Sequence, residues 1–262
     1  MERFKNCFVS AKGSRPSLGA AVLNTLLVCL LVIVLFWISF QRIGLTLDFS
    51  FVADYRVRLW DGFRMTVALG LCGFLLSFLL GLVSALGQSS SILALRYLCN
   101  LYVTVIRGTP LIMQIYLFFY ILGTAWGLEN RFLAGVLILS VFEGAYIAEI
   151  LRGGVQSIDP EQLEAARAVG FTKWQTVRFV WFPQLTVLTA PALTGQFASV
   201  IKDSSLLSMI AVIELTQTIR EITASNFKLF EGYLFLGALY LCLTLPITFL
   251  SKRLERRMRD ET

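Results

Sequence analysis

Residues 159–183 read DPEQLEAARAVGFTKWQTVRFVWFP, a polar stretch with strong helix signals between apolar runs. Asp159 precedes Pro160, and Gln162 follows three residues after Asp159. This pattern predicts an N-cap, a proline at the first helical position and a reciprocal cap. The helix that these signals start is expected to run over Glu161–Val169. A chain embedded in a membrane has little use for such a segment unless a partner on that side holds it.

A second short helix is expected after a sharp turn. Gly170 can take the left-handed conformation that ends the first helix. Thr172 and Gln175 repeat the capping box and predict a helix over Lys173–Phe182, and Pro183 then begins a new apolar run. The segment should fold as helix, turn, helix and membrane span. The alternative is an amphipathic helix pair that lies on the membrane surface without a partner.

The composition is that of an all-α membrane protein. Apolar residues make up 56% of the chain and charged residues 15%, with a mean hydropathy of +0.72. About 20 apolar residues of helix cross a bilayer core. We count six spans, two of which contain charges: 16–41, 65–95, 108–128, 132–151, 184–213 and 232–251. The first is too long for a secretory signal core and lacks a cleavage site, so we expect an uncleaved anchor.

The distribution of lysine and arginine predicts the orientation. With the N-terminus in the cytoplasm, the inner segments carry fourteen of these residues and the outer loops carry seven. Because cytoplasmic segments of membrane proteins are enriched in positive charge, both termini and the loop at 158–183 are expected in the cytoplasm. The net charge of +6 therefore indicates membrane orientation and not binding to nucleic acid.

Several chemistries lack the residues that they require. The chain has no histidine, and its five cysteines are not spaced as metal ligands. It has no phosphate loop of the form G-x-x-x-x-G-K-[S/T], so we expect it to bind no ATP itself. The chain is therefore predicted to be neither an enzyme nor a cofactor-binding protein.

The loop resembles the conserved cytoplasmic loop of permease subunits of ATP-binding-cassette (ABC) importers. That family has E-A-A, then a glycine four residues on, and ends the pattern with a proline after apolar residues. Here these positions are Glu164-Ala165-Ala166, Gly170 and Pro183, at the same spacing. The resemblance implies a type I ABC importer permease core with a cytoplasmic coupling helix-turn-helix. The residues expected to couple it to a partner ATPase are Glu161, Glu164, Ala165, Ala166, Gly170 and Pro183.

Three more segments look like the polar amino acid importers of that superfamily, the histidine, glutamine, glutamate and arginine group. They are Arg107–Leu111, Ala145–Ile158 and Lys202–Leu206. With the loop they cover roughly residues 62–258 in one register. The implied organisation is a transmembrane domain over 61–258 with the coupling loop at 158–183, preceded at 1–60 by a cytoplasmic segment, an extra anchor and an outer loop.

Charged residues within the fifth expected span indicate a substrate path. On a helix Gln196, Ser199 and Asp203 share one face, and Lys202 points about 100° away from Asp203. Because an amino acid zwitterion needs both a cationic and an anionic partner, we expect Lys202 and Asp203, with Ser204, to line the path. The alternatives are a structural ion pair with Glu143 or Glu149, or an outer gate, since Lys202 lies nineteen residues beyond Pro183, roughly 28 Å along a helix.

The resemblance also implies the partners and the location. These are a second permease subunit, identical or related, two ATPase subunits that bind ATP and magnesium, and a periplasmic or surface amino acid-binding protein. Residues 214–231 are the candidate docking surface for that protein, with Glu214, Arg220, Glu221, Lys228 and Glu231. The chain should be a multi-pass protein of the bacterial inner membrane bilayer that moves polar amino acids. Other hypotheses are an ion-coupled secondary transporter, although no internal repeat supports it, and a scaffold subunit without a path.

Overall fold

The computed structural model describes residues 17–44 and 46–261, and the side chains as far as Arg256. The described chain is all-helical, and it divides into two compact units, Met1–Asp48 and Phe49–Thr262. Basic residues near the N-terminus, on which part of the orientation argument depends, lie outside the described residues.

The first unit is formed by one apolar helix, α2 (Leu18–Ile43). The Ser17 side chain caps its start by accepting a bond from the Ala20 N–H, and Gly44 ends it with φ +70°. Almost all of its side chains are exposed, and Ala20 is the one residue of the helix that is buried. A helix that is apolar all round and exposed all round is a membrane span.

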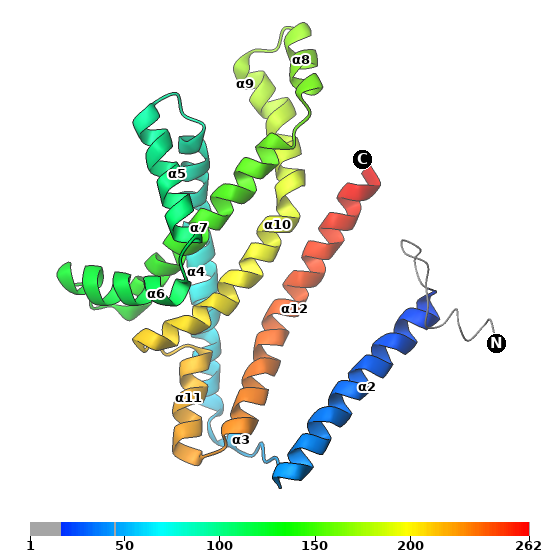
Figure 1. The fold of residues 1–262 in the computed structure, drawn as a ribbon, viewed down its shortest axis with the longest axis vertical. Helices are drawn as coiled ribbons and strands as arrows, with labels where there is room; N and C mark the ends of the chain where they lie inside the picture. The colour runs from blue at the N-terminus through cyan, green and yellow to red at the C-terminus, as the bar shows by residue number, and fades with distance from the viewer. Residues whose placement is uncertain (1–16, 45, 262) are drawn as a thin grey trace. The chain divides into compact units, whose positions relative to one another are not determined.

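The second unit contains the remaining helices (Figure 1). They are α3 (Phe51–Asp54), α4 (Arg56–Gln88), α5 (Leu93–Arg107), α6 (Leu111–Tyr116), the π-helix η1 (Leu117–Gly123), α7 (Arg131–Gln156), α8 (Pro160–Ala168), α9 (Lys173–Thr176), the π-helix η2 (Val177–Trp181), α10 (Phe182–Asp203), the 3₁₀-helix η3 (Ser204–Ile210), α11 (Leu215–Asn226) and α12 (Leu229–Glu261).

The centre of this unit is the contact between α4 and α7. Small residues let the two helices approach closely. A Cβ on Gly81 would lie 2.7 Å from Ile147 Cγ2 and 2.9 Å from the Gly144 carbonyl. Ser77 is fully buried on the same stripe and returns its hydroxyl to the Gly73 carbonyl at 2.7 Å. The Ser77 hydroxyl is therefore hydrogen-bonded within its own helix, as the dry interior of a membrane requires.

A sharp bend lies at the start of the span that was expected at 108–128. The helix pair α5 and α6–η1 is bent by 110° at Gly108–Pro110. Pro110 has no N–H to continue a helical ladder. The buried Gln114 side chain donates its Nε2 to the Ile106 carbonyl at 2.8 Å and to the Thr109 hydroxyl at 2.7 Å. One amide thus satisfies carbonyl and hydroxyl groups at the break, which keeps the bend ordered.

The number of spans is lower than the six expected. Within the described residues, four helices are long and apolar enough to cross a membrane, or up to five if the bent pair counts as one span. The helix that falls short is α10, because glutamine, threonine and serine interrupt its apolar run and two charged residues end it. The four helices that are long and apolar enough are α2, α4, α7 and α12.

Candidate functional sites on the α7–α10 segment

The first loop helix, α8, starts as expected but for one residue. Asp159 caps it by accepting a bond from the Glu161 N–H at 2.9 Å, and Pro160 occupies the first turn. The expected reciprocal cap by Gln162 is wrong. Its side chain instead accepts a bond from Gln184 on α10, so Gln162 ties α8 to the span that follows the loop.

The turn between the two short helices depends on Gly170. Its φ is +84°, in the region where residues with a Cβ are strained. The Phe171 N–H donates to the Ala166 carbonyl at 3.0 Å, and the Gly170 N–H donates to the Arg167 carbonyl at 3.0 Å. These two bonds satisfy carbonyls at the end of α8, as expected for a glycine C-cap.

The second loop helix has the predicted start but not the predicted end. Thr172 and Gln175 form both bonds of the capping box, at 3.3 and 2.7 Å. The helix does not stop before Pro183. It passes through the π-turn η2 into α10, where Pro183 occupies the second position. The π-turn changes the carbonyl pairing just before the proline, where an α-helical bond to its nitrogen is not available.

The α8–α9 loop exposes a set of large apolar side chains. Trp174 is 71% exposed, and the other members are all at least 37% exposed. Phe171 and Phe179 pack ring to ring at 6.3 Å, and the Arg178 guanidinium lies 5.9 Å from the Phe179 ring. We call the following residues the apolar loop set: Val169, Phe171, Trp174, Val177, Phe179 and Phe182. In Figure 1 they belong to the end of the unit where α7 stops and α10 begins.

The residues expected to couple the loop to an ATPase belong to the same segment of the chain as this set. Ala166 is buried and packs the loop together, whereas the others are exposed. The exposed members are Glu161, Glu164, Ala165, Gly170 and Pro183. Sequence reasoning missed the apolar loop set as a surface, although apolar residues at positions 171, 174 and 177 follow a three-residue spacing on a polar segment.

A buried polar cluster joins α7 to α10. Glu143 is completely buried, and its Oε2 accepts a bond from Gln196 Nε2. Its Oε1 has no hydrogen-bond partner. Asp203 and Lys202 both lie near enough to interact with the Glu143 carboxyl. Of the two acidic residues named as ion-pair partners, the structure therefore brings Glu143 to this cluster, while Glu149 pairs elsewhere.

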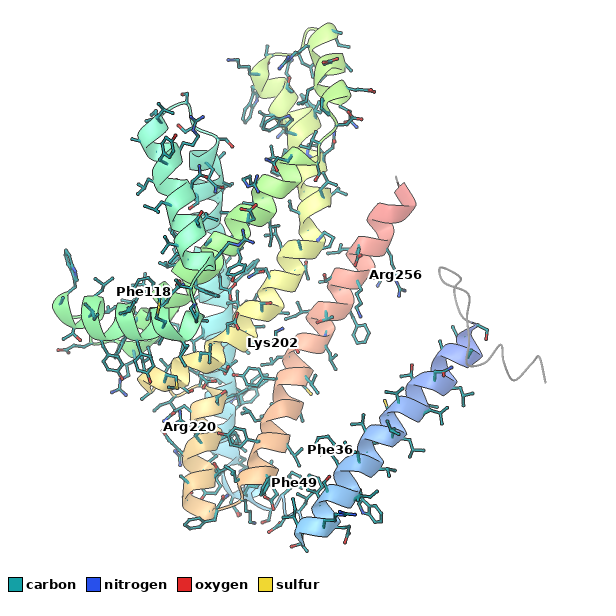
Figure 2. All side chains as sticks on the ribbon, in the orientation of Figure 1. Phe36, Phe49, Phe118, Lys202, Arg220 and Arg256 are labelled. Atoms are coloured by element: carbon teal, nitrogen blue, oxygen red, sulfur yellow. The ribbon has the colours of Figure 1, made fainter. Side chains whose placement is uncertain are left out.

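The other predicted path residues differ in accessibility. Lys202 is exposed, and Figure 2 labels it toward the end of α10 that is remote from the loop. Ser199 and Asp203 are half-buried. Ser204 is completely buried, and its hydroxyl donates to the Ile201 carbonyl at 2.7 Å. The helix also ends at Asp203, ten residues before the expected end of the span, because η3 follows.

A second charged cluster is formed by residues of two other family-like segments, Arg107–Leu111 and Ala145–Ile158. Glu149 and Arg152, three residues apart, form an ion pair within α7. Arg107, the last residue of α5, adds a guanidinium 3.2 Å from Glu149 Oε2 and 5.3 Å from the centre of the Tyr146 ring. No spacing rule relates Arg107 to Glu149, because they come from different helices. The cluster lines a pocket of about 600 Å³.

Two residues of the expected docking surface are buried. Glu214 is completely buried, where it caps α11 through the N–H groups of Thr216 and Gln217, both at 2.8 Å, and accepts a bond from the Tyr240 hydroxyl at 2.9 Å. Glu231 is 6% exposed. Burial raises the pKa of the Glu214 carboxyl to about 7, although these hydrogen bonds act in the opposite direction. Of the residues named there, Arg220 is exposed and Glu221 and Lys228 are half-buried.

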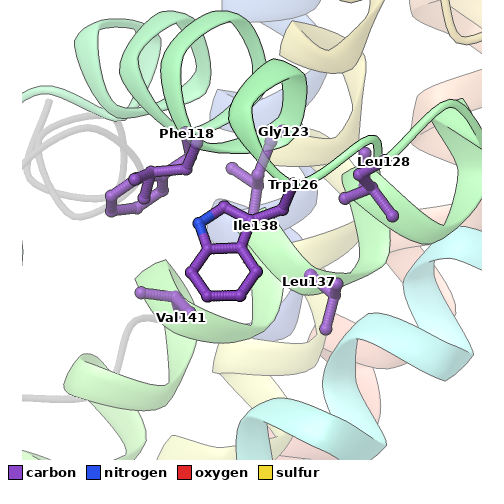
Figure 3. A pocket seen from close by; sticks show the side chains of 9 residues that line it. Phe118, Gly123, Trp126, Leu128, Leu137, Ile138 and Val141 are labelled. Carbon is purple, nitrogen blue, oxygen red and sulfur yellow. The ribbon is translucent and has the colours of Figure 1, made fainter.

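A further hollow between η1 and α7 is almost entirely apolar. Its volume is about 460 Å³, and Phe118, Trp126 and Ile138 are among its walls (Figure 3). Trp126 is 86% exposed. The indole N–H of Trp126 is the one polar side-chain group among its walls, so the hollow offers no charge that could orient a polar amino acid.

Comparisons with known proteins agree with the fold and the loop. The sequence profile of the family described as "Binding-protein-dependent transport system inner membrane component" matches residues 73–260. The glutamine transport system permease protein GlnP of Escherichia coli (strain K12) is 34% identical over 214 residues, which cover 81% of this chain and 98% of that protein. The arginine transport system permease protein ArtQ of Bacillus subtilis (strain 168) is 27% identical over 217 residues, which cover 82% and 99%.

A solved structure gives the same result in three dimensions. It is titled "Crystal structure of an amino acid ABC transporter with histidines", and it matches with a TM-score of 0.75 and 36% identity, covering 81% of this chain and all of that one. The fold and the matched residues define the membrane-embedded permease subunit of an ABC importer. Within that class, this chain belongs to the polar amino acid permease family.

Membership has direct consequences. The chain is the permease component of an ABC amino acid import system, a family whose members are not catalytic, and it is a multi-pass inner membrane protein. A binding-protein-dependent system implies an ATPase and a binding protein as partners. The family profile begins at residue 73, so α2 lies outside the residues that it matches.

Proposed function

We propose that this chain forms one half of the transmembrane path of an ATP-driven importer of polar amino acids, with its termini in the cytoplasm. A second permease subunit, identical or related, would complete the path. Two ATPase subunits would bind ATP and magnesium on the cytoplasmic side. A binding protein would deliver the substrate from outside. Glutamine is the first substrate to test, because it appears in the name of the 34% identical relative.

The apolar loop set supports the ATPase contact more than any other observation. Its side chains are exposed on a loop whose helices are otherwise polar. Exposure of a large apolar surface to water is unfavourable and marks an interaction site. A cleft in a partner would bury these side chains, and aromatic residues such as Trp174 and Phe179 are typical anchors of such interfaces. Glu161 and Glu164 would form the polar rim. The ATPase would thus contact both the apolar loop set and the expected coupling residues.

The position of α10 supports the link to transport. This helix begins at the loop and ends at Lys202 and Asp203. We assign Lys202 to the substrate carboxylate and Asp203 to its ammonium group, since an amino acid zwitterion needs both. Gln196 and Ser199 lie on the Asp203 side of α10, and Glu143 orients Gln196. Ser204 has its hydroxyl bonded to the backbone, so we assign it to positioning the chain at the end of α10.

The proposed mechanism is a conformational switch. Closure of the ATPase subunits would move α8 and α9, and α10 would transmit that movement to the charged cluster. The path would then alternate between inward-open and outward-open states by rigid-body motion of packed helices. No bond in the amino acid is made or broken in this chain.

The test is uptake by the complete transporter in liposomes. We expect glutamine uptake that requires ATP and the binding protein, and that continues when ionophores abolish the ion gradients. Uptake driven by an ion gradient in the absence of any ATPase would support the secondary transporter instead. Binding of the ATPase without any uptake of amino acids would support a scaffold.

A further inference from the structure

The pocket beside Arg107 is a hollow with charged walls between three helices. Gln88 from α4, Asn100 and Arg107 from α5, and Glu149 and Arg152 from α7 line it. Its volume of about 600 Å³ is within the range of small-molecule sites. The proposed transport function uses none of these residues.

The charges in this pocket do not balance. Glu149 is shared, because its Oε1 pairs with Arg152 and its Oε2 with Arg107. One carboxylate thus faces two guanidinium groups, and one positive charge is left. The arginines are 39% and 36% exposed, so donor N–H groups remain accessible. Gln88 is half-buried, and its amide Oε1 is buried without a hydrogen-bond partner. Rotation of that amide would present its NH₂ group to the same space.

The cluster lies near the end of α7, a membrane-spanning helix, and therefore close to the expected membrane boundary. Arg152 is about one helical turn from the end of α7 at Gln156, and the polar helix α8 follows. Leu101 and Val105 are exposed apolar residues of α5. Each directly follows a residue that lines the pocket, Asn100 or Thr104. In a membrane-spanning chain such side chains contact acyl chains. The pocket therefore combines a cationic hollow near the membrane boundary with an apolar flank directed at the hydrocarbon.

We propose that this pocket binds the phosphate group of an anionic phospholipid in the leaflet on the α8–α9 side. Arginine guanidinium groups bind phosphate oxygens with paired N–H donors, and basic pockets between membrane helices are typical sites for anionic headgroups. The phosphate would take the charge that Glu149 leaves uncompensated. The acyl chains would run along Leu101 and Val105. The lipid would thereby join α5, at the bend, to the end of α7 that carries the loop.

The test measures lipid retained by the full chain, purified in mild detergent with the subunits that accompany it. We expect phosphatidylglycerol to be retained in a fixed ratio to protein. Arg107→Gln and Arg152→Gln should each lower that ratio about tenfold, since a hydrogen bond to a charged group is lost. Arg96→Gln is the matched control, because it removes the same charge from α5 outside the pocket, and retention should not change. Arg107→Lys, which keeps the charge without the paired donors, should give an intermediate ratio.

Glu149→Gln separates lipid binding from a purely structural ion cluster. Removing the carboxylate leaves two positive charges, so a lipid site should retain at least as much phosphatidylglycerol as before. A purely structural cluster would instead be disrupted to the same extent by Arg107→Gln, Arg152→Gln and Glu149→Gln. In a second arm, delipidated protein should be stabilised against heat by added phosphatidylglycerol but not by phosphatidylcholine or inorganic phosphate. Equal stabilisation by inorganic phosphate, or equal retention in Arg107→Gln and Arg96→Gln, would overturn the proposal.

Discussion

The proposed coupling function depends on the backbone conformation of Gly170. Its φ is +84°, and a Cβ built there would meet no atom within 4 Å. The cost of a side chain is therefore backbone strain alone, about 1–3 kcal/mol for a β-branched residue. We expect Gly170→Val to reach the membrane at normal abundance, to bind the ATPase weakly, and to lose most of the ATP hydrolysis that binding protein and substrate stimulate.

The control at this position is Gly170→Asn, since asparagine tolerates the left-handed region. Gly170→Asn should keep most of the stimulated ATP hydrolysis although it adds a side chain at this position. Gly237→Ala on α12, where a Cβ also meets no atom within 4 Å, should behave as wild type. Stimulated hydrolysis at the wild-type rate in Gly170→Val would show that the angle of this turn does not transmit the movement.

The charged end of α10 gives a second prediction at the residue scale. Asp203→Asn and Lys202→Ala should each reduce uptake at least tenfold with assembly intact, because each removes a proposed charge partner of the zwitterion on the substrate path. Uptake of radiolabelled glutamine at matched expression is the measurement. Glu143→Gln should raise the KM more than it lowers kcat, since it acts through Gln196. If Lys202→Ala and Asp203→Asn both transport as wild type, the path lies elsewhere.

Glu214 makes stability depend on pH. Its carboxyl has a raised pKa of about 7, against an ordinary value of 4.5, so the folded state holds a proton that the unfolded state releases between these values. The contribution of this group to stability is therefore present below about pH 4.5 and is lost as pH rises toward 7, by up to about 3 kcal/mol. Glu214→Gln should flatten the fall in melting temperature over this range. The exposed-residue control Glu129→Gln should not.

At the scale of elements, the prediction concerns the apolar loop set. Replacing Trp174 and Phe179 by glutamine removes exposed apolar surface, so the isolated chain should remain as stable as before or become less prone to aggregate. Affinity for the ATPase should fall by roughly 2–4 kcal/mol if these are the anchors. The measurement is binding of the purified ATPase to the chain in nanodiscs. Phe249→Gln on α12, also large and exposed but distant in sequence from the loop, should leave the affinity unchanged.

The sequence predicted those elements whose signals are local. Asp159, Gly170, Thr172 and Gln175 determine caps over a few residues, and each acts as predicted. Gln162 did not, because a tertiary partner on α10 competed for its side chain. The glycine and proline at 108–110 indicated a bend before the apolar run, but its angle of 110° depends on how α5 and α6 pack and could not be predicted. The end of α10 at Asp203 was missed, because hydropathy does not separate an α-helix from a 3₁₀-helix.

Residues that meet across helices were the least predictable part of the sites. The pairing of Glu143 with Gln196 and of Arg107 with Glu149 depends on how α5, α7 and α10 pack. No spacing within one helix indicates such a contact. Burial was equally hidden: Glu214 reads as a surface residue in the sequence, yet it is a completely buried cap. Composition and periodicity give the faces of single helices, whereas the contacts between helices require the structure.

At the scale of the whole molecule, the prediction concerns topology. A cysteine placed at Ser50 should react with an impermeant thiol reagent added outside intact cells, and one placed at Thr172 only after lysis, in a background without native cysteines. Both positions are exposed, so access to the reagent depends on the side of the membrane alone. Labelling at position 172 in intact cells would reverse the proposed orientation and remove the loop from reach of a cytosolic ATPase.

The unbroken helical path from Lys173 through η2 to Asp203 has a consequence for energetics. One continuous element carries the proposed ATPase contact at one end and the proposed substrate contact at the other. Any coupling between two sites is reciprocal, so substrate at Lys202 and Asp203 must change the affinity of the loop for the ATPase by the same factor as ATPase engagement changes the affinity for substrate. A cell with abundant amino acid would then hold this permease and its ATPase in a complex of different lifetime from that in a starved cell, with no separate sensor domain required.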